Sequence, residues 1–372
     1  MPRIIDLLAA ITILATVNLG ACQAPPVADW SRTSPENAGL PAGLPAQIDA
    51  GINEGPYKNL HAVVIVRDGK IALENYYQGV DEAMSRPLGD VAFNANTLHD
   101  IRSVTKSVVS LLYGIALGEN LVPPTDTSLL DQFPEYADLA ADPERRKMTV
   151  GNALSMQLGT EWDERISYRN PRNSETAMER ASDRYRFVLD RPMVATPGTQ
   201  WVYNGGTTAL IGRLIEKGSG QTLAEFARER LFTPLNVATF EWARGRDGAY
   251  MAASGLRLRP RDLARIGQLV LDGGRWNGRQ IISEDWLAQS FTVRATVRVD
   301  EIGYGYQWWL SRPSYSGPQL YAGMGNGGQR LFIVPQLDLV VVVTAGNYNR
   351  RKASRQSTIL VTDVILPNVQ AE

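Results

Sequence analysis

Hydrophobic and polar positions along the chain predict strands near both ends and helices between them. Residues 60–67 and 71–77 are two apolar runs separated by Asp68-Gly69, a pair typical of a tight hairpin turn. Residues 329–334 and 337–344 have the same character, and the second run contains four consecutive valines, as a central strand should. The pattern therefore predicts one sheet built from segments that lie far apart in the chain.

The middle of the chain has a helical pattern instead. Residues 207–217 and 261–271 repeat apolar positions at helical spacing, and glycine follows each of them closely. Ser283 is followed by two acidic residues, which predicts the N-cap of another helix. Residues 355–365 suit a closing helix.

Together these elements predict an α/β (α+β) fold, in which an antiparallel sheet is flanked by helices and a mostly helical domain is inserted. We expect residues 30–100 and 291–372 to form the sheet domain and residues 101–290 the helical domain. A functional site would then lie in the cleft between them.

Composition narrows the classes of function. The 372 residues carry 38 basic and 39 acidic side chains, which gives a net charge of −1. A nucleic-acid-binding protein usually shows a basic excess or a basic patch, and this chain has neither. We therefore expect no nucleic-acid partner.

The chain has two histidines and one cysteine, which excludes several chemistries. A zinc site built from Cys and His is not available, no intrachain disulfide is possible, and we expect neither a metal nor an organic cofactor. His61 opens a predicted strand, and His99 precedes Ser103 by only four residues, so neither suits the base of a Ser-His-Asp hydrolase. The G-x-S-x-G element of such enzymes is missing from the sequence as well.

The N-terminus resembles a lipoprotein signal peptide. Residues 1–22 combine a short positive start with an apolar stretch and end in Leu19-Gly20-Ala21-Cys22, which is similar to a bacterial lipobox. We expect Cys22 to be lipidated, residues 23–29 to form a tether, and the protein to be anchored on the periplasmic side of the cell envelope. The alternative is an ordinary signal peptide with a coincidental cysteine.

Ser103 and Lys106 stand three residues apart, just before the strongly apolar run 108–117. If this run is a helix, the two side chains share a face and lie within reach of each other. A serine needs a base to become a nucleophile. Burial and the positive end of the helix dipole should lower the pKa of Lys106 and let it act as that base. A chance occurrence of Ser-x-x-Lys is the alternative.

Two further segments supply groups that a serine–lysine pair needs. Tyr203 precedes the predicted helix 207–217 and offers a second proton carrier, although a tyrosine there also suits a buried core position. Residues 323–328 are rich in glycine and lead into a strand, so their backbone N–H groups are open to an oxyanion. A plain loop is the alternative for this segment.

Residues 30–366 resemble the serine hydrolases of the class C β-lactamase-related family, which also includes penicillin-binding proteins, esterases and 6-aminohexanoate-dimer hydrolases. Residues 102–107 match the S-x-x-K element, and residues 197–203 with 209–216 match the tyrosine element and its helix. Three more segments resemble the branch of oligomer and ester hydrolases: 253–256, 262–267 and 306–309. The resemblance implies a β-lactamase/transpeptidase-like fold.

The resemblance also implies roles for individual residues. Ser103 would be the nucleophile, Lys106 would take or relay its proton, and Tyr203 would share the general-base role and protonate the leaving group. The backbone N–H groups of Ser103 and Asn326 would hold the oxyanion. The reaction would be acyl transfer from a carboxylic ester or small amide to Ser103, followed by hydrolysis.

Two departures from the family bear on the substrate. Gly205 stands where class C β-lactamases carry the asparagine of Tyr-x-Asn, and residues 323–325 stand where they carry Lys-Thr-Gly. The missing lysine and amide normally grip a β-lactam, so the resemblance favours esters and small amides. The candidate substrate contacts are Tyr168, Gly205, Gly325 and Trp308. Residues 304–309 carry four aromatic side chains that form either a wall of the site or ordinary core packing.

Two rival functions remain open at this point. A penicillin-binding D,D-peptidase or β-lactamase would use the same residues on other substrates. A catalytically inactive envelope binding module would keep the fold without the chemistry. The sequence leaves the natural substrate and the oligomeric state open.

Overall fold

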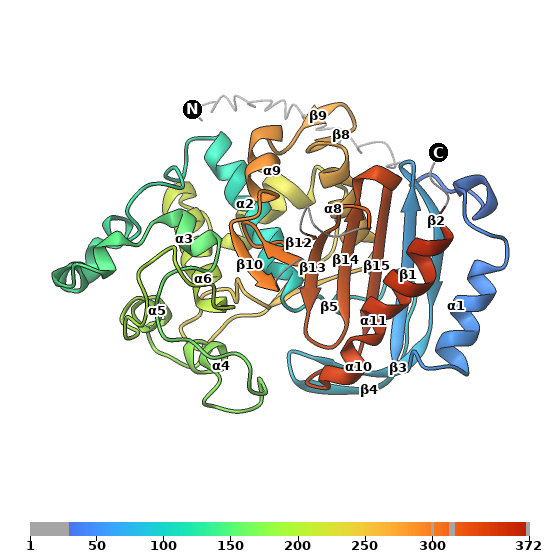
Figure 1. Cartoon of the computed structure of the whole chain (residues 1–372), viewed down its shortest axis with the longest axis horizontal. Coiled ribbons are helices and arrows are strands. Elements are labelled where there is room, and N and C mark those ends of the chain that lie inside the picture. The colour runs from blue at the N-terminus through green and yellow to red at the C-terminus, as the bar shows by residue number, and fades with distance from the viewer. Residues whose placement is uncertain (1–29, 299–300, 312–316, 370–372) are drawn as a thin grey trace, which may run out of the picture.

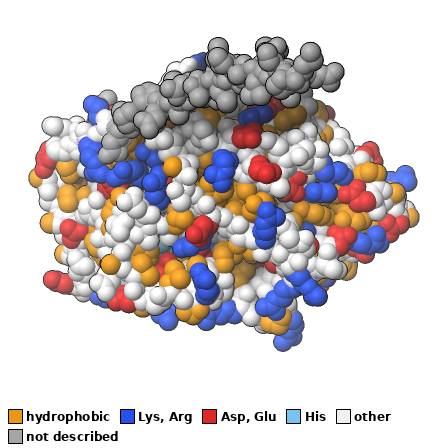
Figure 2. Space-filling model, turned by 180° about the vertical axis from the view of Figure 1, so that it is seen from behind, with side chains coloured by type: hydrophobic (Ala, Val, Ile, Leu, Met, Phe, Trp, Pro, Cys, Tyr) orange, Lys and Arg blue, Asp and Glu red, His pale blue; other side chains and the backbone are white. Residues whose placement is uncertain are grey.

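The computed structural model describes residues 30–298, 301–311 and 317–369. The predicted signal peptide, Cys22 and the tether lie outside these residues. Within the described part of the chain, no helix is long and apolar enough to cross a membrane. Basic and acidic side chains both occur across the face shown in Figure 2.

One antiparallel sheet of eight strands organises the molecule (Figure 1). In spatial order its strands are β10 (Ala295–Arg298), β11 (Ile302–Tyr304), β12 (Trp309–Ser311), β13 (Tyr321–Gly325), β14 (Gln329–Val334), β15 (Leu339–Ala345), β1 (Leu60–Arg67) and β2 (Lys70–Tyr76). The sheet joins the start and the end of the chain because β1 pairs with β15. This confirms the predicted α/β fold with an antiparallel sheet flanked by helices.

The remaining strands of the described segments form three small antiparallel sheets. They are β3 (Gln78–Ala83) with β4 (Arg86–Ala92); β5 (His99–Asp100), β7 (Leu256–Leu258) and β6 (Glu241–Trp242); and β8 (Arg275–Trp276) with β9 (Arg279–Gln280).

The α-helices of the described residues are α1 (Leu44–Asn53), α2 (Val104–Gly118), α3 (Val150–Leu154), α4 (Ser174–Glu179), α5 (Arg184–Leu189), α6 (Gly205–Ser219), α7 (Leu223–Ala227), α8 (Pro260–Leu271), α9 (Glu284–Ser290), α10 (Arg351–Ser354) and α11 (Gln356–Ile359). The predicted closing helix changes character at its middle, because Leu360–Ile365 continues α11 as a π-helix. Ser283 is the N-cap of α9, as predicted, and its side chain accepts a hydrogen bond from the Trp286 N–H.

The central strands bury both of their faces. Successive side chains of a strand point to opposite sides of the sheet. Val340 and Val342 of β15 accordingly join the cluster that contains α2 and α8, whereas Val341 and Val343 join the cluster that contains α1 and the C-terminal helix. The valine run thus forms a central strand covered by helices on both sides.

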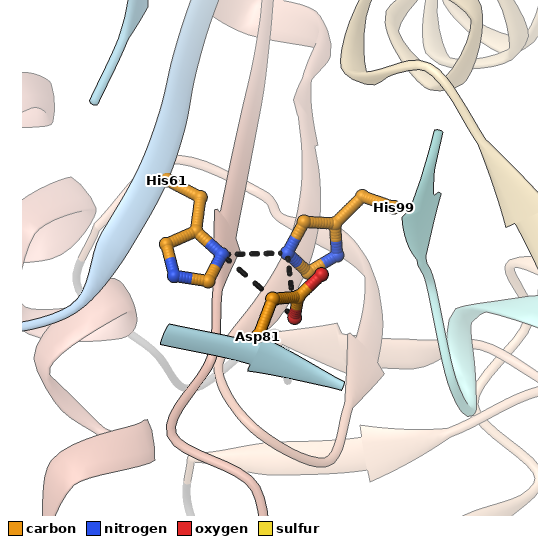
Figure 3. A group of neighbouring side chains, drawn as sticks. All are labelled: His61, Asp81 and His99. Carbon is orange, nitrogen blue, oxygen red and sulfur yellow. Dashed lines mark hydrogen bonds and ion pairs between the residues drawn. The ribbon is translucent and has the colours of Figure 1, made fainter. Parts of the chain in front are cut away.

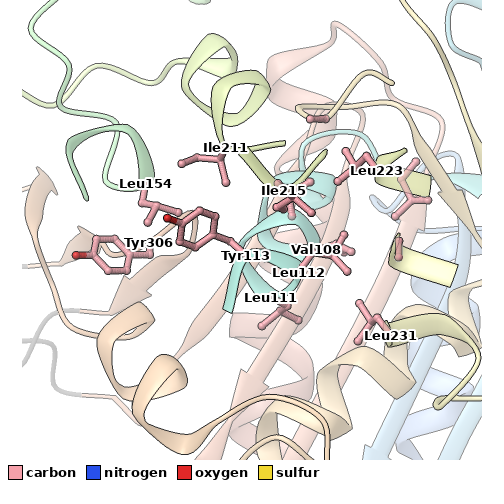
Figure 4. Close-up of a cluster of buried hydrophobic side chains, with 14 of the residues drawn as sticks. Val108, Leu111, Leu112, Tyr113, Leu154, Ile211, Ile215, Leu223, Leu231 and Tyr306 are labelled. Atoms are coloured by element: carbon pink, nitrogen blue, oxygen red, sulfur yellow. The ribbon is translucent and has the colours of Figure 1, made fainter. Parts of the chain in front are cut away.

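The helix α2 is buried between the sheet and the helical region. Its apolar side chains share one cluster with those of α6 (Figure 4), including Val108, Leu111, Leu112, Ile211 and Ile215. Close packing of this kind fixes both helices relative to each other. The N-termini of α2 and α6 carry the residues that the sequence marks as catalytic.

Candidate active site

Ser103 is the N-cap residue of α2, and its side chain makes no capping hydrogen bond. The hydroxyl is therefore not committed to the helix backbone. Lys106 lies one turn further along, with Nζ 3.2 Å from Oγ of Ser103. The spacing of three residues thus brings the two side chains together, as the sequence predicts.

Lys106 is almost completely buried and has three polar neighbours. Its Nζ donates to Ser103, to Oε2 of Glu175 at 3.2 Å and to the carbonyl oxygen of Ala253 at 2.9 Å. Burial alone would lower the pKa of Lys106, but Glu175, Tyr203 and Glu164 together raise it above its usual value. The prediction of a lowered pKa was wrong, because the sequence does not show the buried carboxylates that pair with the ammonium.

Tyr203 lies two residues before α6 and faces the same lysine. The Lys106 ammonium is 5.0 Å from the centre of its ring. Burial raises the pKa of Tyr203 above its usual value, although Lys106 and a hydrogen bond with Ser103 oppose the rise. The hydroxyl is therefore protonated at neutral pH, and a phenolate formed there would be stabilised by the ammonium.

An aromatic group holds Tyr203 in place. Trp309 stacks on its ring with centroids 5.6 Å apart, and Trp201 and Tyr304 contact Trp309 on its edges. Of the four aromatic residues in 304–309, Tyr304 and Trp309 thus pack beside the site, whereas Tyr306 and Trp308 belong to the large core cluster.

Two buried glutamates complete the site, and the sequence analysis did not find them. Glu175 belongs to the short helix α4, and burial alone would raise its pKa, but Lys106 and Ser254 hold that pKa below its usual value. Burial and Glu175 raise the pKa of Glu164 to about 7. No local pattern marks either glutamate, since both lie in ordinary polar segments and reach the lysine only through the fold.

Glu164 also connects Tyr168 to the site. Its Oε2 accepts a hydrogen bond of 2.8 Å from the Tyr168 hydroxyl, and its Oε1 accepts one from the Trp162 indole. Burial and Glu164 raise the pKa of Tyr168 well above its usual value. The phenol therefore remains a hydrogen-bond donor over the working pH range.

The glycine-rich segment brings Asn326 to the same pocket as Ser103. A Cβ on Gly325 would meet the carbonyl oxygen of Ile101 at 2.5 Å, so only glycine lets β13 approach the start of α2 this closely. The backbone N–H groups of Ser103 and Asn326 donate no hydrogen bond to any described residue. Within the described residues, both N–H groups thus remain uncommitted.

Asn349 ties this segment to Tyr168. Its Oδ1 accepts from Nδ2 of Asn326 at 3.3 Å and from the backbone N–H of Tyr168 at 3.3 Å, and its own N–H donates to Oδ1 of Asn326. The loop after β15 therefore positions two sides of the site.

A pocket of about 350 Å³ opens over Ser103. Its lining includes Arg102, Tyr168 and Asn326. Arg102 has a φ of 48°, an uncommon conformation for a side chain other than glycine. Its guanidinium pairs with Glu82 at 3.0 Å and Asp100 at 3.1 Å, which holds the residue before the nucleophile in this conformation.

Two expected substrate contacts have other places in the structure. Trp308 is completely buried and packs edge-on against Phe291, so its indole does not reach the pocket. Gly205 is also buried, and a Cβ there would meet Oε2 of Glu175 at 2.3 Å. Gly205 thus makes room for the carboxylate that pairs with Lys106.

Neither histidine lines this pocket. His61 and His99 are completely buried beside Asp81. Burial and His99 lower the pKa of His61 to about 2.

The antiparallel sheet flanked by helices, with a serine and a lysine on the first turn of one buried helix and a tyrosine just before another, is the arrangement of the β-lactamase-fold hydrolases. The β-lactamase family model matches residues 61–361, and the chain therefore belongs to this family. The family resemblance seen in the sequence is confirmed.

Individual relatives support a branch of the family. A 6-aminohexanoate-dimer hydrolase from Paenarthrobacter ureafaciens is 23% identical over 305 residues, which cover 76% of this chain and 71% of that protein. A lovastatin esterase from Penicillium rubens is 29% identical over 157 residues, which cover 39% of this chain and 37% of that protein. A Bacillus anthracis structure provisionally identified as a 6-aminohexanoate-dimer hydrolase superposes with a TM-score of 0.69 at 21% identity, covering 86% of this chain and 81% of that one.

Proposed function

We propose that the protein is a serine hydrolase that cleaves carboxylic esters or small amides through an acyl-enzyme on Ser103. The observation that carries this proposal is the contact of the Ser103 hydroxyl with Lys106 and Tyr203 on the wall of an open pocket. A nucleophile, a proton relay and a protonated phenol are the groups that acyl transfer needs.

The attack on the substrate uses the ion pair as a relay. Lys106 first passes a proton to Oε2 of Glu175 and, as a neutral amine, then takes the proton of Ser103 Oγ as this oxygen adds to the carbonyl carbon. Both transfers run along contacts of 3.2 Å. Lys106 starts and ends this step as an ammonium, so the raised pKa of the lysine does not block it.

The negative charge on the former carbonyl oxygen is held by the backbone N–H groups of Ser103 and Asn326. Such donors act without reorganisation because the backbone already fixes them. The close approach that Gly325 permits brings the Asn326 N–H to this place.

Tyr203 protonates the leaving alkoxide or amine and becomes a phenolate beside the Lys106 ammonium. In the second half of the reaction this phenolate takes a proton from water, whose oxygen attacks the acyl carbon. As the acid product leaves, Ser103 Oγ regains a proton from Lys106, and Glu175 returns its proton to the lysine. Ser103, Lys106, Glu175 and Tyr203 thereby return to their starting protonation states.

Several observations favour esters and small amides over β-lactams. Gly205 and Gly323 stand where β-lactamases carry the asparagine and lysine that normally grip a β-lactam, so the site has neither side chain. The two relatives named above are, by their names, a hydrolase of an aminohexanoate dimer and an esterase.

The test compares Ser103→Ala with Ser107→Ala on p-nitrophenyl butyrate. Ser107 is a second buried serine of α2, and its hydroxyl donates to the Gln307 carbonyl outside the pocket. We expect Ser103→Ala to lose both ester hydrolysis and labelling by a fluorophosphonate probe, and Ser107→Ala to keep both. Undiminished turnover by folded Ser103→Ala would refute the proposal. Turnover of nitrocefin faster than that of the ester would favour a β-lactamase instead.

A further inference from the structure

His61, Asp81 and His99 converge from three different strands on one buried point (Figure 3). His61 comes from β1, Asp81 from β3 and His99 from β5. The three residues are at most 3% exposed, and Oδ2 of Asp81 has no hydrogen-bond partner. A buried carboxylate is costly unless positive charge or hydrogen bonds compensate it, so the cluster calls for a further positive group.

The outer ring nitrogens of both histidines face oxygen acceptors. Nδ1 of His99 lies 2.9 Å from the carbonyl oxygen of Asp100. Nε2 of His61 lies 3.2 Å from Oδ1 of Asn59. The Asn59 amide is oriented by the backbone, because its Nδ2 donates to the Val80 carbonyl and its Oδ1 accepts from the Val80 N–H. Both outer nitrogens therefore carry the ring proton.

Two neutral rings arranged in this way point bare lone pairs at each other. The inner nitrogens, Nδ1 of His61 and Nε2 of His99, are 2.8 Å apart. A neutral imidazole has only one N–H, so neither ring has a proton left for this contact. Something positive must lie between the two lone pairs and the Asp81 carboxylate.

The spacing of the three inner atoms fits a metal ion. Oδ1 of Asp81 lies 4.0 Å from Nδ1 of His61 and 3.7 Å from Nε2 of His99. A triangle with sides of 2.8, 3.7 and 4.0 Å has a point about 2.1 Å from all three corners. Zinc binds imidazole nitrogen and carboxylate oxygen at about 2.0–2.2 Å.

We propose that His61, His99 and Asp81 bind one divalent transition-metal ion of the zinc type. Two imidazoles and a carboxylate suit zinc or cobalt, whereas magnesium and calcium prefer oxygen ligands alone. The surrounding hydrogen bonds have the form usual around metal ligands. Each outer N–H is held by an oxygen, and the Tyr348 hydroxyl donates to Oδ1 of Asp81 at 2.9 Å.

An ion can enter the site from the surface, and once bound it would link three strands. Asp81 and Tyr348 also line a separate surface pocket of about 700 Å³, through which an ion can reach the ligands. A bound ion would join β1, β3 and β5 and fix the segment that leads through Asp100 and Arg102 to Ser103. The sequence analysis predicts no metal site because it counts only cysteine and histidine as ligands. The proposed site differs from that prediction because an aspartate supplies the third ligand.

The test uses purified protein with an affinity tag that contains no histidine. The protein is stripped by a chelator, incubated with Zn²⁺ or Co²⁺, and then desalted. The chain has only two histidines, so no other His pair competes for the metal. We expect one equivalent of Zn²⁺ or Co²⁺ to be retained, the visible absorption of low-coordinate Co²⁺, and a rise in melting temperature with ZnCl₂ but not MgCl₂. His99→Gln and Asp81→Asn should lose all three signals.

Two further variants keep the test decisive if a ligand variant does not fold. Tyr348→Phe keeps every ligand and should weaken metal affinity about 10- to 100-fold. Glu82→Gln removes the neighbouring carboxylate, which pairs with Arg102, and should bind metal like the parent. Stripped parent protein that takes up no metal would overturn the proposal and leave a shared proton between the rings. Equal uptake by the parent and the ligand variants would overturn it as well.

Discussion

The ammonium of Lys106 lies 3.2 Å from the carboxylate of Glu175, and both side chains are buried. This ion pair changes how the serine–lysine motif works. A buried lysine without a partner would lose its proton. A lysine paired with a carboxylate keeps its proton, and it can take up another only by passing one on to that carboxylate. The carboxylate is therefore as much a part of the proposed proton path as the lysine.

Replacing this carboxylate should stop the relay. In Glu175→Gln the lysine has no acceptor for its proton, and we expect kcat for p-nitrophenyl butyrate to fall about 100-fold or more, as for other lost acid–base groups. Circular dichroism establishes that the variant is folded. Glu161→Gln, which changes an exposed glutamate, is the control. Equal kcat in both variants would remove Glu175 from the mechanism.

The raised pKa of Glu164 should appear in the pH dependence of stability. Its pKa rises from 4.5 to about 7, so the folded protein holds this proton more tightly than the unfolded chain does. The resulting stabilisation is present below pH 4.5 and is lost as pH rises through about 7. Glu164→Gln is neutral at every pH and should not show this loss.

We therefore expect the melting temperature of the parent, relative to that of Glu164→Gln, to fall between about pH 5 and pH 8. Glu161→Gln supplies the comparison for a carboxylate outside the buried pair, and its difference from the parent should stay nearly constant. A pH-independent difference for Glu164→Gln would show that the carboxyl titrates near its usual pKa.

Gly325→Ala tests the close approach of β13 to the nucleophile. The added Cβ meets a backbone oxygen, which cannot rotate away as a side chain would, so β13 must move and take the Asn326 N–H with it. A displaced oxyanion donor should lower kcat about 10- to 100-fold. Gly43→Ala is the matched control, because a Cβ there meets nothing within 4 Å. Parent-like kcat in Gly325→Ala would mean that this N–H does not hold the oxyanion.

The sequence predicts the large elements well because their signals are local. The alternating burial of Val340 to Val343 needs only a strand with covered faces, and the run after Ser103 needs only a buried helix. The same holds for the contact of Ser103 with Lys106, since helical geometry alone sets the distance between positions i and i+3.

The electrostatics of the site could not be predicted in this way. Glu164 and Glu175 come from a segment with short helices and loops, and only tertiary packing places them beside Lys106. Trp308 shows the converse, because its neighbour Trp309 stacks on Tyr203 while Trp308 faces the core. Trp308 lies just before β12 and Trp309 begins it, so one position along the chain decides between core and site.

The packing of α2 itself gives the last prediction. A Cβ on Gly114 would lie 2.0 Å from Cδ1 of Trp286, whose indole is buried and donates to the Ser110 carbonyl. Since the indole cannot move without breaking that bond, Gly114→Ala should lower the free energy of unfolding by about 1–3 kcal/mol. Gly118→Ala at the end of the same helix meets nothing within 4 Å and should be neutral or stabilising by up to about 1 kcal/mol.

Urea denaturation of both variants measures this difference. Because α2 also carries Ser103 and Lys106, the displacement at Gly114 should lower kcat together with stability, whereas Gly118→Ala should keep the parent kcat. If Gly114→Ala unfolds at the same urea concentration as the parent, the contact between α2 and Trp286 is looser than the structure shows. Equal destabilisation by both substitutions would instead point to the helix backbone, because the two variants share only the change from glycine to alanine.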